Sequence, residues 1–199
     1  MSTSATAIFG GTFDPIHCAH LMVAREAADT FSINRVLFIP AAQPPHKSDS
    51  TCASWEDRFH MVELACRADP RFIPSRLEEG DGPSYSILTI EKVRRETDDL
   101  WFIIGTDAFA EIATWHRWRE VIAETGFIVV TRPGHQWLAP PGARVRRLDT
   151  LALPVSSSDI RTRLAAGEIP PELSPEVADY IRARGLYNWP ATASPPASP

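Results

Sequence analysis

Four short and nearly uninterrupted apolar runs constrain the fold of this chain more than any other feature of its sequence. They span residues 6–9, 36–39, 100–104 and 127–130. A strand with one face in water alternates apolar and polar residues, whereas a strand that helices cover on both faces is apolar along its whole length. The runs therefore predict the strands of a parallel sheet that lies between two layers of helices.

Stretches with helical spacing of apolar residues lie between these runs, at residues 17–31, 55–66 and 86–95. Ser54 precedes the second stretch and Asp57 follows three residues later, which is the arrangement of a capping box. Strands that alternate with helices in this way predict βαβ units. We therefore expect an α/β fold with a doubly wound parallel sheet.

Length and charge limit the domain organisation and the partners. The 199 residues fit one domain, expected over residues 1–189, and the tail of Pro, Ala and Ser over residues 190–199 is expected to be disordered. The formal net charge of -5 argues against binding to nucleic acid or to a membrane surface, because both partners need a basic face.

The sequence also predicts a compartment. Its apolar runs are far shorter than the roughly 18 to 20 residues of a membrane span, and residues 1–6 lack the pattern of a secretory signal. Cys18, Cys52 and Cys66 form no C-x-x-C pair, which argues against a disulfide framework and a thiolate zinc site. We therefore expect the protein in the reducing cytoplasm.

The segment after the first predicted strand, GGTFDPIHCAH, has the composition of a phosphate cradle. In a doubly wound sheet, ligands bind beyond the carboxyl ends of the strands. Gly10 and Gly11 let the backbone turn sharply and approach a ligand closely. A helix that begins near Ile16, with Asp14 as its N-cap and Pro15 in its first turn, would direct unpaired N–H groups at the same space.

His17 and His20 are three residues apart on this predicted helix, so both rings are expected to face the same way. Two imidazoles beside a glycine loop are able to donate hydrogen bonds to phosphate oxygens and to stabilise charge that develops there. Two other interpretations stay open. The pair would be half of a metal site if further ligands joined it, or it would serve only in capping and packing.

Together with later segments, this loop resembles a known family. GGTFDPxHxGH is the signature of the nucleotidyltransferase superfamily with the HIGH-type motif, and the TFDP form resembles the bacterial nicotinate-nucleotide adenylyltransferases. Further family-like segments follow in the family's order: PPHK (44–47), GPSYS (82–86), IIGTDAF (103–109), TRPG (131–134), VSSSDIR (155–161) and YIRARGLY (180–187). The resemblance covers nearly the whole chain up to Tyr187.

The resemblance implies a Rossmann-like nucleotidyltransferase fold and a reaction. The phosphate of nicotinate mononucleotide would attack the α-phosphate of ATP, giving deamido-NAD and pyrophosphate in NAD biosynthesis. Mg²⁺ would be bound by the triphosphate and not by protein side chains. No covalent enzyme intermediate is expected, and the sequence shows no Ser-His-Asp or Cys-His grouping that would suggest one. The oligomeric state stays open, a homo-oligomer included.

The resemblance also implies the residues of the site. The catalytic residues would be His17, His20, Lys47 and Arg161. ATP would contact Gly10, Gly11, Thr12, Phe13, Gly105, Asp107, Ser157 and Ser158. Nicotinate mononucleotide would contact Ser84, Tyr85, Ser86, Trp115 and Arg132.

Four of these residues also have simpler interpretations. Lys47 alone would be an ordinary surface lysine, although only 2 of the 20 basic residues in this chain are Lys. Arg161 would be a solvated arginine behind a run of capping serines, and Asp107 would cap a helix. Arg132 would belong to a structural ion pair. The family pattern favours the functional interpretation for Lys47 and Arg161. For Asp107 both interpretations can hold together, and for Arg132 the ion pair stays open.

Several positions depart from the family pattern. Ala19 replaces the usual Gly of HxGH, which is the mildest change available, so we expect activity to survive. Ser86 and Ser158 replace Thr and keep the hydroxyl. His116 follows Trp115 where the family often has an aromatic residue, which predicts weaker stacking on the second face of the nicotinate ring.

Three other functions compete with this one. The acceptor would instead be pantetheine phosphate, nicotinamide mononucleotide or another phosphorylated alcohol, but Trp115 and the SYS segment favour nicotinate mononucleotide. A catalytically silent nucleotide-binding module would not need His17, His20 and Lys47, which are all present. A metal-dependent hydrolase would need metal ligands that the sequence does not reveal.

Replacing Arg161 by Ala is expected to raise the KM for ATP and to lower kcat, because the guanidinium would no longer pair with the phosphates. Steady-state kinetics with varied ATP measure both constants. Kinetics identical to those of the wild type would contradict the role of Arg161.

Overall fold

The computed structural model describes residues 5–42, 51–80, 84–131, 137–150 and 155–190. These ranges contain a sheet of six parallel strands in the order β3-β2-β1-β4-β5-β6. The four apolar runs lie in β1 (Thr6–Gly11), β2 (Arg35–Pro40), β4 (Leu100–Gly105) and β5 (Gly126–Thr131). The predicted parallel sheet is therefore confirmed.

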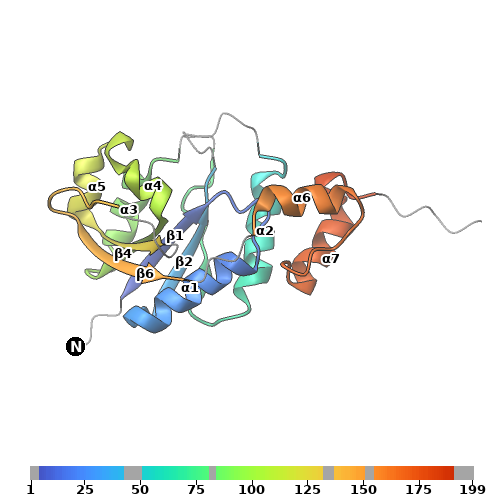
Figure 1. The fold of residues 1–199 in the computed structure, drawn as a ribbon, viewed down its shortest axis with the longest axis horizontal. Helices are drawn as coiled ribbons and strands as arrows, with labels where there is room; N and C mark the ends of the chain where they lie inside the picture. Colours follow the sequence, from blue (N-terminus) through green and yellow to red (C-terminus); the bar gives the residue numbers. More distant parts are fainter. Residues whose placement is uncertain (1–4, 43–50, 81–83, 132–136, 151–154, 191–199) are drawn as a thin grey trace, which may run out of the picture.

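Helices cover both faces of the sheet, as Figure 1 shows, so the doubly wound arrangement is also confirmed. One face carries α1 (Cys18–Phe31) and α2 (Trp55–Cys66). Beyond α2 lie α6 (Ser157–Ala165), α7 (Pro175–Arg184) and the short 3₁₀ segment η2 (Leu186–Asn188), whose buried residues join the same hydrophobic cluster. The other face carries α3 (Ser86–Arg94), α4 (Thr106–Ala110), α5 (Trp118–Glu124) and the 3₁₀ segment η1 (Ile112–Thr114).

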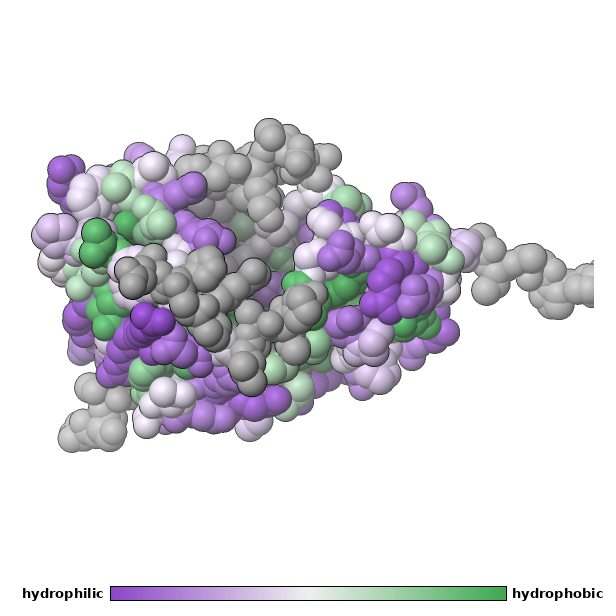
Figure 2. All heavy atoms as spheres, in the orientation of Figure 1, coloured by the Kyte–Doolittle hydropathy of each residue, from purple (hydrophilic) through white to green (hydrophobic). Residues whose placement is uncertain are grey.

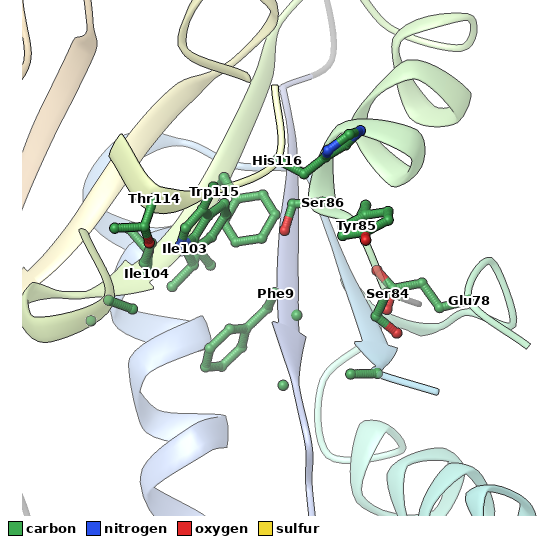
Figure 3. A pocket seen from close by; sticks show the side chains of 16 residues that line it. Phe9, Glu78, Ser84, Tyr85, Ser86, Ile103, Ile104, Thr114, Trp115 and His116 are labelled. Atoms are coloured by element: carbon green, nitrogen blue, oxygen red, sulfur yellow. The ribbon is translucent and has the colours of Figure 1, made fainter. Parts of the chain in front are cut away.

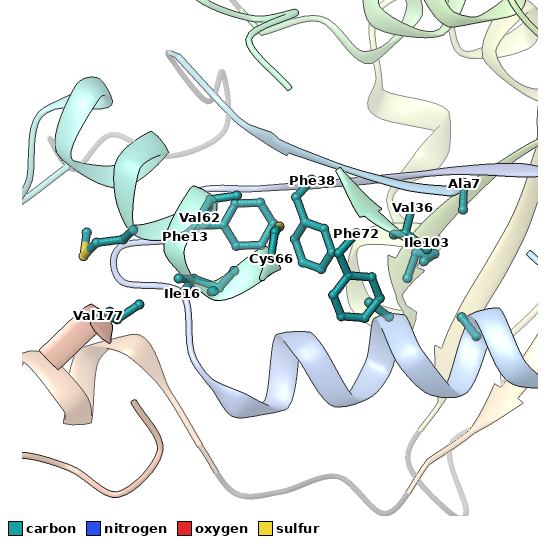
Figure 4. Close-up of a cluster of buried hydrophobic side chains, with 14 of the residues drawn as sticks. Ala7, Phe13, Ile16, Val36, Phe38, Val62, Cys66, Phe72, Ile103 and Val177 are labelled. Atoms are coloured by element: carbon teal, nitrogen blue, oxygen red, sulfur yellow. The ribbon is translucent and has the colours of Figure 1, made fainter. Parts of the chain in front are cut away.

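Consecutive residues of a strand belong to two separate hydrophobic clusters, one on each face of the sheet. Ala7 of β1 belongs to the cluster under α1 and α2, whereas Ile8 belongs to the cluster under α3 to α5. Figure 4 shows the first cluster, in which Phe38 of the sheet lies close to Phe72 and Val62. A fully buried Ile or Phe side chain contributes about 1.5–3 kcal/mol through removal from water. Apolar residues at every position of a strand therefore stabilise both layers.

Two strands of the sheet were not predicted. β3 (Phe72–Pro74) has three residues and ends in proline, so it leaves no apolar run to recognise. β6 (Arg144–Asp149) has the sequence RVRRLD and forms the edge of the sheet, where charged residues are tolerated and only Leu148 is buried. Both strands lie at the edges, where burial on two faces is not required.

The strand order reverses between β1 and β4. From β1 the chain continues outward through β2 and β3, and from β4 it continues to the opposite edge through β5 and β6. Ligands of doubly wound proteins bind beyond the carboxyl ends of the two strands at such a point. Gly10 and Gly11 end β1 and Gly105 ends β4, so the predicted loop lies at this position.

Two further expectations concern the C-terminal tail and membrane spans. Apart from Pro190, the predicted tail over residues 190–199 lies outside the described residues. Within the described ranges, none of the helices combines the length and the hydropathy that crossing a membrane requires.

Gly126 faces Trp101 across β4 and β5, and an added methyl group would not fit there. A Cβ at Gly126 would lie 2.6 Å from two ring atoms of Trp101. That ring is buried, and the guanidinium carbon of Arg146 lies 4.0 Å from its centroid. Gly126→Ala is therefore expected to lower the free energy of unfolding by about 1–3 kcal/mol, measured by urea denaturation.

Gly105→Ala is the matched control for stability. Gly105 has a φ of -73°, and a methyl group added there would meet no neighbouring atom within 4 Å. The free energy of unfolding of this variant should therefore stay close to that of the wild type. Equal stabilities of the two variants would contradict the packing account.

Candidate active site

The loop after β1 turns tightly around a buried aromatic ring. A Cβ on Gly11 would lie 3.0 Å from two ring atoms of Phe13, so a larger residue at this position would require the Phe13 ring to shift. Phe13 has a φ of 49°, and its ring lies 5.8 Å from the rings of both Phe9 and Phe38. The side chain of Phe13 belongs to the core, so only the backbone of this residue remains for the predicted contact with ATP.

The helix after this loop begins later than predicted. α1 starts at Cys18 with His17 as its N-cap, and not near Ile16 with Asp14 as the cap and Pro15 in the first turn. The backbone N–H of Cys18 donates to the carbonyl of Glu172 at 2.8 Å. The prediction was wrong because the carboxylate of Asp14 has partners elsewhere.

Asp14 is buried and its carboxylate joins three distant segments. It accepts hydrogen bonds from the backbone N–H groups of Cys52 at 2.7 Å and Ala53 at 3.2 Å. The hydroxyl of Tyr187 donates a third bond, at 2.7 Å. A buried carboxylate needs such donors, so these contacts fix where the loop lies relative to α2 and the C-terminal segment.

A buried arginine supports the same loop from α2. Arg58 is 1% exposed, and its Nη1 donates to the carbonyl oxygens of Thr12 at 2.7 Å and Ala41 at 2.9 Å. Burial lowers the pKa of Arg58, and the nearby Asp14 carboxylate raises it. Thr12, predicted to bind ATP, thus has its carbonyl engaged by the protein.

The sequence contained a signal for Arg58 that was missed. Position 58 lies on the same helical face as Met61, Val62 and Ala65, which are all buried. A charged residue in line with an apolar face is expected to have buried partners. Ser54 was predicted correctly, since it is the N-cap of α2 and accepts from the backbone N–H of Asp57.

His17 and His20 lie against each other at the start of α1, as their spacing predicted. Their ring centroids are 3.8 Å apart, and the backbone N–H of His17 donates to Nδ1 of His20 at 3.2 Å. With Nδ1 accepting, the neutral His20 ring carries its proton on Nε2 and is a donor there. Nδ1 of His17 is buried and has no hydrogen-bond partner among the described residues.

Burial changes the protonation of His17. It lowers the pKa of His17 to about 4, and the negative charge of Glu172 only partly opposes this. His17 is therefore neutral at neutral pH in the protein without ligand. A neutral imidazole still donates one hydrogen bond, which suits contact with a phosphate oxygen.

The first turns of α6 rest on the loop after β1. Ser156 caps this helix by accepting from the backbone N–H of Asp159. The hydroxyl of Ser157 donates to the carbonyl of Pro15 at 3.2 Å. Arg161 is more than a solvated arginine behind a cap, because its own contacts reach the same loop.

Arg161 links this loop to α6 through both terminal nitrogens. Nη1 donates to the carbonyl of Asp14 at 2.8 Å, and Nη2 donates to the hydroxyl of Ser158 at 3.2 Å. The structure thus gathers His17, His20, Ser157, Ser158 and Arg161 around the loop. This group has the donors and the positive charge that a polyphosphate needs.

A pocket of about 470 Å³ opens at the carboxyl ends of β1 and β4. Figure 2 shows that the face of the molecule is hollowed near its centre, and Figure 3 shows the pocket from close by. The lining brings together seven predicted residues: Gly10, Gly11, Ser84, Tyr85, Ser86, Gly105 and Trp115. It also includes residues that sequence reasoning missed, among them Phe9, Glu78, Phe102 and Thr114.

Aromatic rings and backbone donors give the pocket its chemistry. Trp115 meets Phe102 edge to face with centroids 5.9 Å apart. His116 stacks on Tyr85 at 4.4 Å, so its ring is engaged within the protein. Tyr85 is the N-cap of α3 without a side-chain hydrogen bond, which leaves the N–H groups of the first turn at Ser86 without a capping side chain. A flat ring that bears a negative group fits this combination.

A carboxylate also stands in the pocket lining. Oε1 of Glu78 accepts a hydrogen bond of 2.7 Å from the hydroxyl of Thr89, which is buried on α3. The hydroxyl of Ser84 accepts from the backbone N–H of Ala42 at 2.9 Å. These bonds connect the end of β2, the segment before α3 and α3 itself around the pocket.

Five predicted residues are in neither group. Two of them, Thr12 and Phe13, belong to the loop after β1. Asp107 is exposed in the first turn of α4, whose N-cap is Gly105, so Asp107 does not cap the helix. Lys47 and Arg132 lie outside the described residues. Among the residues that are described, no group of three or more His, Cys, Asp and Glu side chains is arranged to hold a metal ion.

Comparison with known proteins defines the class. A profile of the cytidylyltransferase-like family matches residues 8–163. This range includes β1 with its glycine loop, the pocket and the first turns of α6. The chain belongs to the cytidylyltransferase-like family of nucleotidyltransferases.

Curated relatives define the family within this class. A probable nicotinate-nucleotide adenylyltransferase of Solibacter usitatus is 58% identical over 185 residues, covering 92% of this chain and 98% of that protein. One of Acidothermus cellulolyticus is 41% identical over 192 residues, covering 90% and 92%. The chain is a member of the nicotinate-nucleotide adenylyltransferase family.

Solved structures support the fold. The Plasmodium falciparum nicotinic acid mononucleotide adenylyltransferase complexed with NaAD matches with a TM-score of 0.75 at 21% identity, over 94% of this chain and 98% of that chain. A putative nicotinate-nucleotide adenylyltransferase from Vibrio parahaemolyticus matches with a TM-score of 0.64 at 21% identity, over 92% and 95%.

The ring of His17 is expected to titrate with a midpoint near pH 4 in the protein without ligand, because burial disfavours its charged form. NMR measurement of the ring signals across pH 3.5–8, with the His17→Asn variant for assignment, would determine the midpoint. A midpoint near the unperturbed value of about 6.5 would show that the ring is accessible to water.

Proposed function

We propose that this protein transfers the adenylyl group of ATP to nicotinate mononucleotide and forms deamido-NAD and pyrophosphate. One observation carries the proposal. An aromatic pocket and a group of His, Ser and Arg side chains lie beside the same glycine loop, in a chain of the nicotinate-nucleotide adenylyltransferase family.

The pocket suits the nicotinate ring. Trp115 offers an indole plane on which a pyridine ring stacks. The first-turn N–H groups of α3 at Tyr85 and Ser86 would donate to the carboxylate of the ring, where the positive end of the helix dipole also favours a negative charge. We assign the phosphate of the mononucleotide to Arg132.

The loop and α6 suit the triphosphate. His17 and His20 would donate to phosphate oxygens, and Arg161 would pair with the β- and γ-phosphates. Lys47 would add a second positive charge. The adenosine would lie near Gly105 and Asp107, at the carboxyl end of β4.

The reaction is a direct displacement at the α-phosphorus of ATP. A phosphate oxygen of nicotinate mononucleotide forms a bond to that phosphorus, and the bond from the α-phosphorus to the oxygen that bridges to the β-phosphate breaks. Pyrophosphate leaves with that oxygen and its electron pair. The protein holds the reactants in line and neutralises the charge that develops on the leaving group, without becoming bonded to the substrate.

Mg²⁺ would enter with ATP as part of the substrate. This ion prefers phosphate oxygens and water and needs at most one or two protein carboxylates. When bound, Mg²⁺ supplies positive charge to the triphosphate.

We place the reaction in the cytoplasm. Cys18, Cys52 and Cys66 are free thiols, which suits a reducing compartment.

The experiment that tests this function is a pyrophosphate-release assay with purified protein, ATP and Mg²⁺. Nicotinate mononucleotide, nicotinamide mononucleotide and phosphopantetheine are compared as acceptors in parallel. Release is expected to be fastest with nicotinate mononucleotide, because its carboxylate alone can pair with the first-turn N–H groups of α3. The His17→Ala variant, purified identically, controls for contaminating enzymes. Faster release with either of the other acceptors, or none with any acceptor, would refute the proposed function.

A further inference from the structure

The C-terminal segment reaches the candidate active site through Tyr187. This residue lies in η2 and is 7% exposed, and its hydroxyl donates to Oδ1 of Asp14 at 2.7 Å. We propose that Tyr187 is a positioning residue for adenylyl transfer, which through Asp14 holds Arg161 in place against the phosphates of ATP. This inference rests on the function proposed above.

Asp14 links the two residues because its side chain and its carbonyl bind different partners. The carboxylate accepts from Tyr187, and the carbonyl oxygen of the same residue accepts from Nη1 of Arg161 at 2.8 Å. The next carbonyl, of Pro15, accepts from the hydroxyl of Ser157. A shift of the Asp14 backbone would therefore move the first turns of α6 and the guanidinium together.

Tyr187 holds Asp14 from the side on which Arg161 lies. The other two donors to the carboxylate, Cys52 and Ala53, come from the segment before α2. Tyr187 and Arg161 line one groove of about 530 Å³, which Cys52 also borders, and η2 packs against α6. Figure 1 shows α6 and α7 together beside α2, so the end of the chain returns to the loop after β1.

The conformation and the protonation of Tyr187 suit a fixed donor. Its φ of 57° lies in the left-handed region, which a bulky residue adopts when its surroundings hold it there. Burial and the Asp14 carboxylate raise the pKa of Tyr187 well above its usual range, although Arg161 and Arg58 oppose this. The hydroxyl therefore stays protonated and donates at any pH used in an assay.

The chain offers a matched control in Tyr180. Its hydroxyl donates to Oδ1 of Asp57 at 2.8 Å and also connects the C-terminal part of the chain with α2. The chemistry of the two bonds is the same, but Asp57 has no contact with Arg161 among the interactions of the described residues. Tyr180→Phe therefore removes a comparable bond without changing the phosphate-binding group.

The test compares Tyr187→Phe with Tyr180→Phe in the pyrophosphate-release assay. Loss of the Tyr187 hydroxyl is expected to raise the KM for ATP about tenfold and to lower kcat, because a small displacement of a positioning group weakens binding and catalysis together. The KM for nicotinate mononucleotide should stay unchanged. Tyr180→Phe should leave both KM values unchanged. A lower folded fraction would reduce only the apparent kcat, and thermal unfolding measures that fraction separately.

A double-mutant cycle tests whether Tyr187 acts through Arg161. In the Arg161→Ala background, Tyr187→Phe should give no further rise in the KM for ATP, because the group that it positions is gone. A wild-type KM in Tyr187→Phe, or an equal further rise in the Arg161→Ala background, would overturn the proposal.

Two further measurements keep the outcome decisive. If Tyr187→Phe does not fold, Asp14→Ala tests the same link, since it removes the acceptor of the Tyr187 bond and keeps the carbonyl that binds Arg161, and an unchanged KM for ATP there would overturn the proposal. If the wild type releases no pyrophosphate with nicotinate mononucleotide, the proposed function fails. Calorimetric titration with ATP and Mg²⁺ alone then still tests the positioning role, because binding should weaken in Tyr187→Phe and not in Tyr180→Phe.

Discussion

The buried carboxylate of Asp14 is the interaction on which the rest of this site depends. A carboxylate removed from water is tolerated only where donors surround it, and here they come from residues 52–53 and from Tyr187. Segments far apart in the sequence must therefore meet at one point. Arg58 of α2 adds a buried positive charge and donates to the carbonyls of Thr12 and Ala41. These two residues follow β1 and β2, so α2 fixes the ends of both strands.

The candidate site has two parts, which the proposed function assigns to the two substrates. The reversal of strand order between β1 and β4 opens a pocket at the strand ends, and the segment before α3 and the residues after η1 complete it with Tyr85 and Trp115. The part around Arg161 depends on the chain after the sheet, because α6 brings Arg161 back to the loop after β1. The contacts of Asp14 fix this loop relative to residues 52–53, Tyr187 and Arg161.

The sequence predicted the elements that have a regular apolar pattern and the loop that carries a motif. Continuous apolar runs identified the inner strands, and the glycine loop with its two histidines located the site. It did not predict β6, whose charged residues suit an edge strand, or the role of Asp14, because its partners come from sequence positions 38 to 173 residues away. The rules for helix starts consider only neighbouring residues, and they therefore predicted Asp14 as the N-cap of α1 where the structure has His17. Glu78 was missed for the same reason, since only the folded chain brings it to the pocket beside Thr89.

A crystal structure of the protein with deamido-NAD tests the central claim most directly, because one ligand then occupies both parts of the site. The account predicts electron density for the pyridine ring against Trp115, with its carboxylate at the first turn of α3. The two phosphates of the ligand should lie at the glycine loop, because the β- and γ-phosphates assigned to Arg161 have left as pyrophosphate. A dinucleotide whose pyridine ring lies outside the pocket, or whose phosphates lie away from this loop, would contradict the account.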